Sequence, residues 1–191
     1  MIDALNIWLD EFEKLPDDPT GDMSPTNLAN FVNVRVTGKL DTSTSIVKWD
    51  PPPSFTWQKS IFEDTLRAIS KVPSSDPIIP AIKIATGWQN AVIASTVVIQ
   101  PQAIMNPPFP ATSGIAATAV SIIDPASVAL GYAHLVAQLS GVLPVNIKKA
   151  AVFPKAIREA FLMLTVTISG VDTKPPPTGP IPFNYPMTKI Q

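Results

Sequence analysis

The chain has no cysteine, a single histidine and few charged residues. Of its 191 residues 15% are charged, whereas 46% are hydrophobic. Disulfides and thiolate chemistry are therefore excluded. A zinc site would have to be built from His134 and carboxylates, a donor set that suits this metal poorly. With 14 Lys and Arg against 15 Asp and Glu, the chain also lacks the basic surplus that nucleic-acid binding requires. We therefore expect no metal, no cofactor and no nucleic-acid partner.

The few charges are unevenly distributed along the chain. Acidic residues gather in the first 22 positions, whereas residues 77–147 hold only Lys83 and Asp124 as charged side chains. Charged residues normally make up about a quarter of a chain. This low-charge segment is therefore either the core of the domain or a surface that a partner covers.

A membrane span is not expected in this segment. Residues 125–144 are free of charge, and about 20 apolar residues are needed to cross a bilayer. However, the run contains His134 and Gln138 and has proline at both ends, and the mean hydropathy of the chain is only +0.22. The run therefore predicts a buried helix. Residues 1–15 carry acids without a basic start, so we expect no signal peptide there.

The N-terminal segment is predicted to be an amphipathic helix. Hydrophobic residues recur at spacings of three and four over residues 2–15, and Trp8 and Phe12 belong to that stripe. Two interpretations are open. The helix packs on its own domain, or it is an arm whose Trp8 and Phe12 anchor on another subunit.

Five further helices are predicted from periodicity and from proline at helix starts. Pro25 begins one that Gly38 ends, and Asp124 caps another that begins at Pro125. Trp88 and Tyr132 lie on the apolar stripes of two of these helices and are candidate interface residues. The expected ranges are 25–38, 56–70, 80–94 and 125–141, and a last helix begins at Pro154 and ends at Gly170. Helix and strand remain alternatives over 80–100, where extended chain is predicted to follow the helix.

Short extended segments complete the predicted fold. β-Branched and small residues favour strands at 46–49 and 116–123, whereas the prolines of 101–112 favour irregular structure. The fold class predicted is mainly α, with α+β as the alternative if residues 80–94 form a strand. We expect an acidic helix and loop over 1–22, a single domain of five to six helices over 23–172, and a C-terminal arm over 173–191.

The C-terminal arm is rich in proline, including the run 175–177. Such a segment forms neither a helix nor a central strand, so an extended conformation is predicted. Disorder and docking remain alternatives. Phe183 and Tyr185 favour docking, because free linkers rarely hold aromatic residues.

No catalytic constellation is found in the sequence. His134 lies within an apolar helix and is interpreted as a core or interface residue, and neither a nucleophile elbow nor a phosphate-binding loop is present. Glu63 and Asp64 are predicted to lie on a wet helix face near Lys59 and Arg67 as ordinary ion pairs. We therefore expect neither an enzyme nor a small-molecule substrate.

The middle and the end of the chain carry a resemblance to known proteins. The Ala/Ser/Thr/Val/Ile-rich stretch AVIASTVVIQPQAIMNPPFPATSGIAATAVSIIDPASVALGYAHLVAQL, and FPKAIREAFLMLTVTISGVD followed by PPPTGP, resemble small virion structural proteins of tailed bacteriophages. The resemblance implies a subunit of the capsid, neck, tail or baseplate, with tail or baseplate favoured. It implies that the partners are copies of the chain and other virion proteins, and that the chain is located in a virion assembled in the host cytoplasm.

The residues expected at protein interfaces are Trp8, Phe12, Trp88, Tyr132, Phe183 and Tyr185. The alternative function is a non-viral adaptor that binds a protein through the N-terminal helix or the proline-rich tail.

Overall fold

A computed structural model describes most of the chain. The described residues are 4–16, 24–40, 47–49, 52–71, 76, 78–98, 102–105, 115–116, 118–140, 151–172 and 181–187. The predicted acidic loop over 17–22 and the residues 173–180 and 188–191 of the predicted arm lie outside them.

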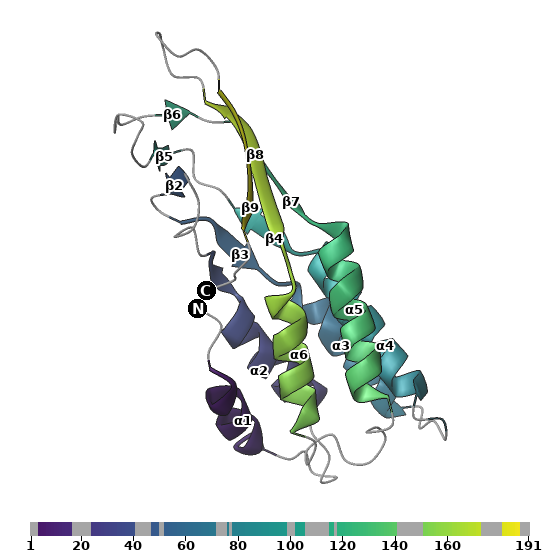
Figure 1. Cartoon of the computed structure of the whole chain (residues 1–191). Coiled ribbons are helices and arrows are strands. Elements are labelled where there is room, and N and C mark those ends of the chain that lie inside the picture. The colour runs from purple at the N-terminus through teal and green to yellow at the C-terminus, as the bar shows by residue number, and fades with distance from the viewer. Residues whose placement is uncertain are drawn as a thin grey trace.

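The described residues form six helices, which lie together at one end of the molecule, and the strands extend from the other (Figure 1). The helices are α1 (Leu5–Glu13), α2 (Pro25–Val36), α3 (Lys59–Lys71), α4 (Ile78–Ile93), α5 (Pro125–Leu139) and α6 (Val152–Leu162). Neighbouring helices pack in the order α2, α3, α4, α5, α6, α1. Each helix therefore turns one side to a shared interior and one side outward.

The strands form three small antiparallel sheets, each of three strands. The first contains β1 (Gly38–Lys39), β3 (Ser54–Thr56) and β4 (Thr96–Val98). The second contains β2 (Val47–Trp49), β5 (Gln102–Met105) and β6 (Ile115–Ala116). The third contains β7 (Thr118–Ile123), β8 (Val166–Asp172) and β9 (Ile181–Met187). The mainly α fold class is confirmed, and the predicted helix at 80–94 is α4, so the strand alternative for these residues is excluded.

Aromatic rings connect the helices in the interior. Phe161 of α6 lies between Trp57 and Trp88, with centroid distances of 5.6 Å to each and edge-on geometry. On the α1 side, Trp8 meets Phe31 at 5.4 Å. Such pairs contribute about 0.5–1.5 kcal/mol each beyond the burial of their area.

Helix starts follow the predicted chemistry to different degrees. At α5 the Asp124 carboxylate accepts a hydrogen bond from the Ala126 backbone N–H at 3.0 Å, and Pro125 occupies the first turn. At α2 Pro25 is likewise in the first turn, but the Ser24 side chain makes no capping bond. The proline therefore marks both starts, and the side-chain cap is made only at the aspartate.

The first interpretation of the N-terminal helix is the one seen in this structure. Trp8 and Phe12 of α1 are buried against Phe31 of α2 and Phe153 of α6. Helix α1 therefore packs on its own domain and belongs to the same hydrophobic core as the other helices.

Several predicted helix boundaries and one predicted irregular segment are wrong. Helix α3 begins at Lys59 instead of residue 56, because Thr56 pairs with Thr96 between β3 and β4. Helices α4 and α6 each begin two residues before the predicted Pro80 and Pro154.

Helix α6 ends at Leu162 instead of continuing to Gly170, and residues 166–172 form β8. The β-branched residues from Thr165 to Ile168 lose side-chain freedom in a helix and pair readily in a sheet; Ile168 lies opposite Ser121 of β7. Likewise, residues 102–105, predicted to be irregular, pair with β2.

The predicted arm is in part an edge strand. Residues 181–187 pair along β8, with Pro182 opposite Val171 and Pro186 opposite Thr167. Among the described strands, in the order β7-β8-β9, this strand has β8 as its one neighbour, and an edge strand is where proline is tolerated. The exclusion of a central strand therefore holds, whereas the free extended arm is corrected for residues 181–187.

Candidate interaction surface

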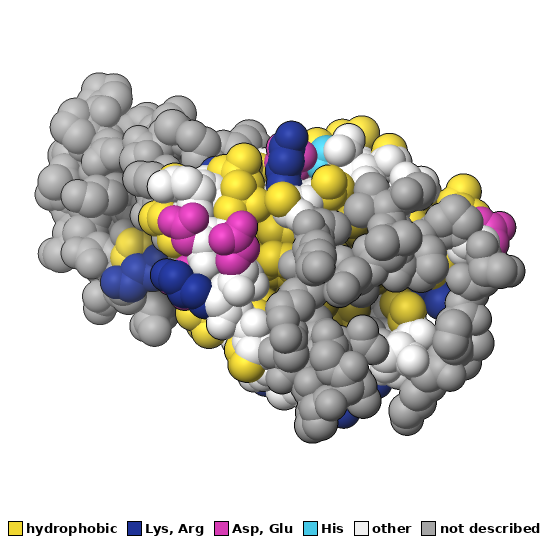
Figure 2. All heavy atoms as spheres, turned by 90° about the horizontal axis from the view of Figure 1, so that it is seen from below, with side chains coloured by type: hydrophobic (Ala, Val, Ile, Leu, Met, Phe, Trp, Pro, Cys, Tyr) yellow, Lys and Arg dark blue, Asp and Glu magenta, His cyan; other side chains and the backbone are white. Residues whose placement is uncertain are grey.

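The outward sides of the helices differ in chemistry. Charged residues of both signs lie on α3 and α6, on α1 and at its C-terminal cap: Asp10, Glu11, Glu13, Lys14, Lys59, Glu63, Asp64, Arg67, Lys155, Arg158 and Glu159. Figure 2 shows acidic and basic side chains gathered on the side of the molecule where α1 lies. On α4 the only charged residue is Lys83, and α5 has none apart from the titratable His134.

Large apolar side chains take the place of charges on the outside of α4 and α5. Ile93 is 65% exposed and Leu130 is 64% exposed, and Ile78 and Ile82 are also exposed. A soluble monomer normally exposes such side chains singly. Here several of them lie on two helices that are packed side by side.

We define the α4–α5 face as the partly or fully exposed residues on the outer side of the contact between these two helices. Its members are Ile78, Ile82, Gln89 and Ile93 of α4 and Pro125, Ala129, Tyr132 and Val136 of α5. Their spacings of four, seven and three residues place each set on one side of its helix. None of the eight side chains is charged.

The core sides of the same helices explain why they pack so closely. A Cβ atom placed on Gly131 of α5 would collide with the Trp88 ring and would lie 3.2 Å from the Ala160 carbonyl oxygen. Glycine at this position therefore lets the buried indole of α4 lie directly against the backbone of α5. Trp88 thus fixes how α4 and α5 are placed relative to each other.

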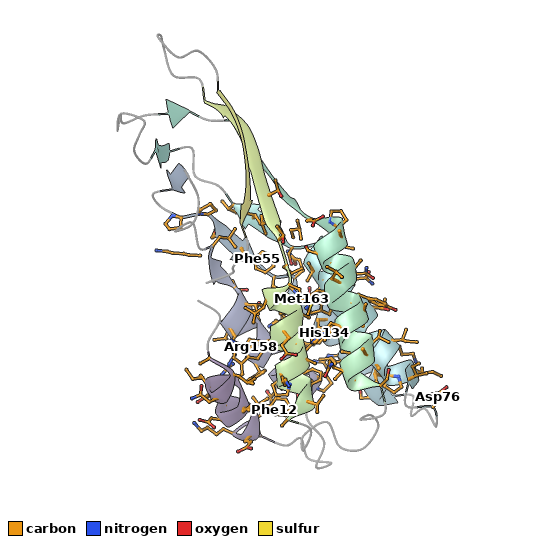
Figure 3. All side chains as sticks on the ribbon, in the orientation of Figure 1. Phe12, Phe55, Asp76, His134, Arg158 and Met163 are labelled. Atoms are coloured by element: carbon orange, nitrogen blue, oxygen red, sulfur yellow. The ribbon has the colours of Figure 1, made fainter. Side chains whose placement is uncertain are left out.

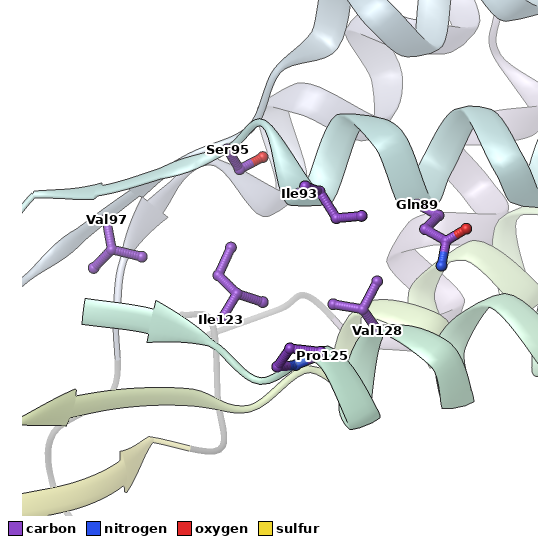
Figure 4. A pocket seen from close by; sticks show the side chains of 7 residues that line it. All are labelled: Gln89, Ile93, Ser95, Val97, Ile123, Pro125 and Val128. Carbon is purple, nitrogen blue, oxygen red and sulfur yellow. The ribbon is translucent and has the colours of Figure 1, made fainter.

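A cavity of about 470 Å³ lies at the end of the α4–α5 face nearest the strands (Figure 4). It is lined by Gln89, Ile93, Ser95, Val97, Ile123, Pro125 and Val128. The Ser95 hydroxyl donates to the Ala91 carbonyl at 2.6 Å and accepts from the Gln58 N–H at 3.2 Å, so its bonding is satisfied inside the chain. The cavity therefore offers a mainly apolar wall.

The six residues predicted at interfaces have different positions. Trp8, Phe12 and Trp88 are almost completely buried in the core of this chain, so they present no surface to a partner in this conformation. Helical spacing identified their apolar stripes correctly, but it does not tell which element covers a stripe. Tyr132 is half-buried and packs against the core from the α4–α5 face.

Phe183 and Tyr185 lie on β9. Their backbones are opposite Gly170 and Ile168 of β8, and their side chains lie outside the described part of the structure. Their role at an interface remains a prediction.

Sequence reasoning missed Ile82, Ile93 and Leu130, which are exposed on α4 and α5. The available signal was that both helices carry apolar residues on nearly all sides. Such helices are normally buried by something, yet Ile82, Ile93 and Leu130 are exposed in this structure.

A few ionisable side chains of the described residues connect neighbouring helices. His134 Nε2 of α5 lies 3.0 Å from the Glu159 carboxylate of α6 (Figure 3), and the Lys155 ammonium is 4.0 Å from the other oxygen of that carboxylate. The Arg35 guanidinium lies 4.0 Å from the Phe31 ring centroid and 3.8 Å from Glu11. These contacts join α5 to α6 and α2 to α1.

Glu63 of α3 connects this helix to α2. It accepts a hydrogen bond from the Thr26 hydroxyl at 2.7 Å and one from Arg67 at 2.6 Å. The bond from Thr26, followed by that from Arg67, holds the pKa of Glu63 below its ordinary value. The carboxylate is thus kept charged by partners that position helices.

Two further classes of site were checked over the described residues. They contain no group of three or more His, Cys, Asp and Glu side chains that could hold a metal ion. No helix among them has the length and apolarity needed to span a membrane.

The chain was compared with protein families, with curated proteins and with solved structures. No family model, curated protein or solved structure matches it. The geometry of the α4–α5 face is therefore the basis for a functional conclusion.

Proposed function

We propose that this chain is a structural subunit of a virus particle, in the tail or baseplate of a tailed bacteriophage, and that it assembles through the α4–α5 face. The observation that carries the proposal is the mainly apolar outward side of α4 and α5, where Lys83 is the only charged side chain besides the titratable His134, in a molecule whose other helices carry more charged residues or pairs of charges. The resemblance of the chain to small phage virion proteins supplies the kind of particle.

The physical basis is the burial of apolar surface on assembly. Each Å² of apolar surface removed from water contributes about 25 cal/mol, and within the face Ile93 is 65% exposed and Ile78 and Ile82 are also exposed. In a particle, neighbouring subunits cover such side chains permanently. The exposed apolar residues of one subunit therefore do not lower the solubility of the particle. Its partners are copies of itself and other virion proteins, and its location is the virion.

The adaptor function has less support. It relies on an N-terminal helix or a proline-rich tail that is free to bind another protein. Trp8 and Phe12, the anchors of that helix, are buried in the core, and residues 181–187 of the tail pair with β8.

Mass spectrometry of purified particles from the source of this chain tests the proposal. The expected result is that the chain copurifies with the particles at a constant, multiple copy number through density-gradient and salt washes. A non-structural protein from the same infected cells serves as the control and should be lost in the washes. Loss of the chain together with that control would contradict the proposal.

A further inference from the structure

The α4–α5 face has the form of two antiparallel rods of similar length. Helix α4 has 16 residues and α5 has 15, which correspond to about 24 Å and about 22 Å. The chain leaves α4 at Ile93 and enters α5 at Pro125, and both residues line the same cavity, so the two helices run in opposite directions. A second pair of helices of the same length would match the face along its whole extent.

The charge pattern restricts what can cover this face. A partner that laid charged side chains on it would bury them without counter-charges, which is strongly unfavourable. Lys83 follows Ile82 by one position, about 100° around α4, so its long side chain keeps the ammonium in water at the rim of the contact. The Asp124 carboxylate is committed to the cap of α5. The covering surface must therefore be uncharged and apolar as well.

The same chain contains a surface of that kind. Among the described helices, α4 and α5 are the two whose outward positions are mainly aliphatic. Helices α3 and α6 carry both acids and bases, α1 carries acids with Lys14 at its C-terminal cap, and α2 presents the polar Asn30. The surface complementary to the α4–α5 face in length and in charge is thus the α4–α5 face of a second copy.

The size of the face is adequate for a pair of copies. Two adjacent helices about 22 Å long and about 10 Å wide each present about 450 Å² in projection. Two copies therefore cover about 900 Å², and the relief of the side chains raises the accessible area above this projected value. A specific interface buries at least about 1,000 Å² in total, so the pairing must use the whole face.

We propose that two copies of this chain pair through their α4–α5 faces about a two-fold axis, so that four helices pack together and the cavity lined by Ile93 and Val128 receives apolar side chains of the other copy. The pairing is isologous, because each face meets the same face. The inference rests on the proposed function and names the first contact of the assembly.

Sedimentation equilibrium of the full chain and of three variants tests this pairing. The unaltered chain should be a dimer. Ile82→Glu and Ile93→Glu should each raise the dissociation constant by at least about thirtyfold, because each places an unpaired carboxylate in the contact. Val34→Glu is the matched control: Val34 is 76% exposed on α2, and this variant should dimerise like the unaltered chain. Circular dichroism should show the same helix content for all four proteins.

Two results would overturn the pairing. One is an unaltered chain that stays monomeric up to its solubility limit. The other is a dimer that Val34→Glu weakens as much as Ile93→Glu does.

Cross-linking tests the two-fold symmetry. The chain has no cysteine, so Ala129→Cys introduces one thiol at an exposed position of the face, and Ala68→Cys introduces one at an exposed position of α3. A short bismaleimide should join copies of the first variant into covalent dimers and leave the second as single chains. Two results would contradict a two-fold contact. One is an equal yield of covalent dimer from the two variants, and the other is an Ala129→Cys variant that dimerises in solution but is not cross-linked.

The two proposals fail separately. A chain that is present in purified particles but monomeric by sedimentation overturns the pairing and leaves the structural function intact. A chain that dimerises through the α4–α5 face but is absent from particles overturns the structural function alone.

Discussion

The helices α4 and α5 share one core with α1, α3 and α6, but the outward surface of the first two is mainly apolar and that of the other three is charged. The core-facing sides of all of them carry aromatic and aliphatic side chains, such as Trp8, Trp88 and Phe161. On the outside, Glu63 forms an ion pair with Arg67 at 2.6 Å and the Glu159 carboxylate lies 3.0 Å from His134, whereas Ile78, Ile82 and Ile93 are exposed on α4. An apolar side of a helix can face either the core or a partner. What distinguishes α4 and α5 is that their outward sides are apolar too, whereas the outward sides of α1, α3 and α6 are charged.

The largest effect is expected from removing the side chain that fixes the α4–α5 pair. Trp88→Ala should lower the free energy of unfolding by about 3–5 kcal/mol, because it empties a fully buried site that also packs against Phe161 and Gly131. Ile93→Ala, on the outer side of the same helix, should change it by less than about 0.5 kcal/mol in the monomer. Denaturant unfolding at low protein concentration measures both. Similar losses for the two variants would break the distinction between the sides of α4.

A smaller effect is expected from adding one carbon atom between α4 and α5. Gly131→Ala should destabilise the chain by about 1–3 kcal/mol, because its Cβ meets the rigid, buried Trp88 ring and the Ala160 carbonyl. Ala129→Val adds volume on the outer side of the same helix and is the matched control, with a change of less than about 0.5 kcal/mol. Thermal unfolding compares the two; a neutral Gly131→Ala would show that the helices are not held at this separation.

The predictability of the fold follows from local and non-local causes. Pro25 and the Asp124–Pro125 pair determine where helices start through contacts within one turn, so sequence reasoning placed these starts correctly. The residues from Val166 to Ile168 become a strand because β7 and β9 lie beside them. These partners are distant in the sequence. Hydrophobic periodicity does not report them, so it predicted a helix that extends beyond the actual end of α6.

The candidate site was predictable in one respect and not in another. The shortage of charge over residues 77–147 pointed to the α4–α5 region. Which apolar residues of this region are exposed was not predictable, because Trp88 and Ile93 are both apolar and differ only in the side of α4 on which they lie. Trp8 and Phe12 illustrate the same limit, since their stripe is covered by α2 and α6.

The smallest effect is expected from the charged side of the molecule. The pKa of Glu63 is lowered by the hydrogen bond from Thr26 and by Arg67, so the charged carboxylate stabilises the fold above the ordinary glutamate pKa of about 4.3. This contribution, about 1 kcal/mol, is lost as the pH falls through the lowered pKa. Glu63→Gln should therefore be less stable than the unaltered chain at pH 7 and approach it in stability near pH 3.

Unfolding by urea at pH 7 and pH 3 measures this difference. Asp64→Asn, at the exposed neighbouring position of α3, is the control and should show little change at either pH. A stability gap between Glu63→Gln and the unaltered chain that stays the same at both pH values would show that charge is not the cause.

The most direct test of a covered α4–α5 face is the rate of thiol labelling in the assembled particle. Particles carrying Ala129→Cys and particles carrying Ala68→Cys are treated with a charged maleimide, and each rate is compared with that of the same variant unfolded in denaturant. The predicted result is strong protection of the thiol at position 129 and rapid labelling at position 68. Equal labelling rates at the two positions would contradict the assignment of the α4–α5 face as the contact surface.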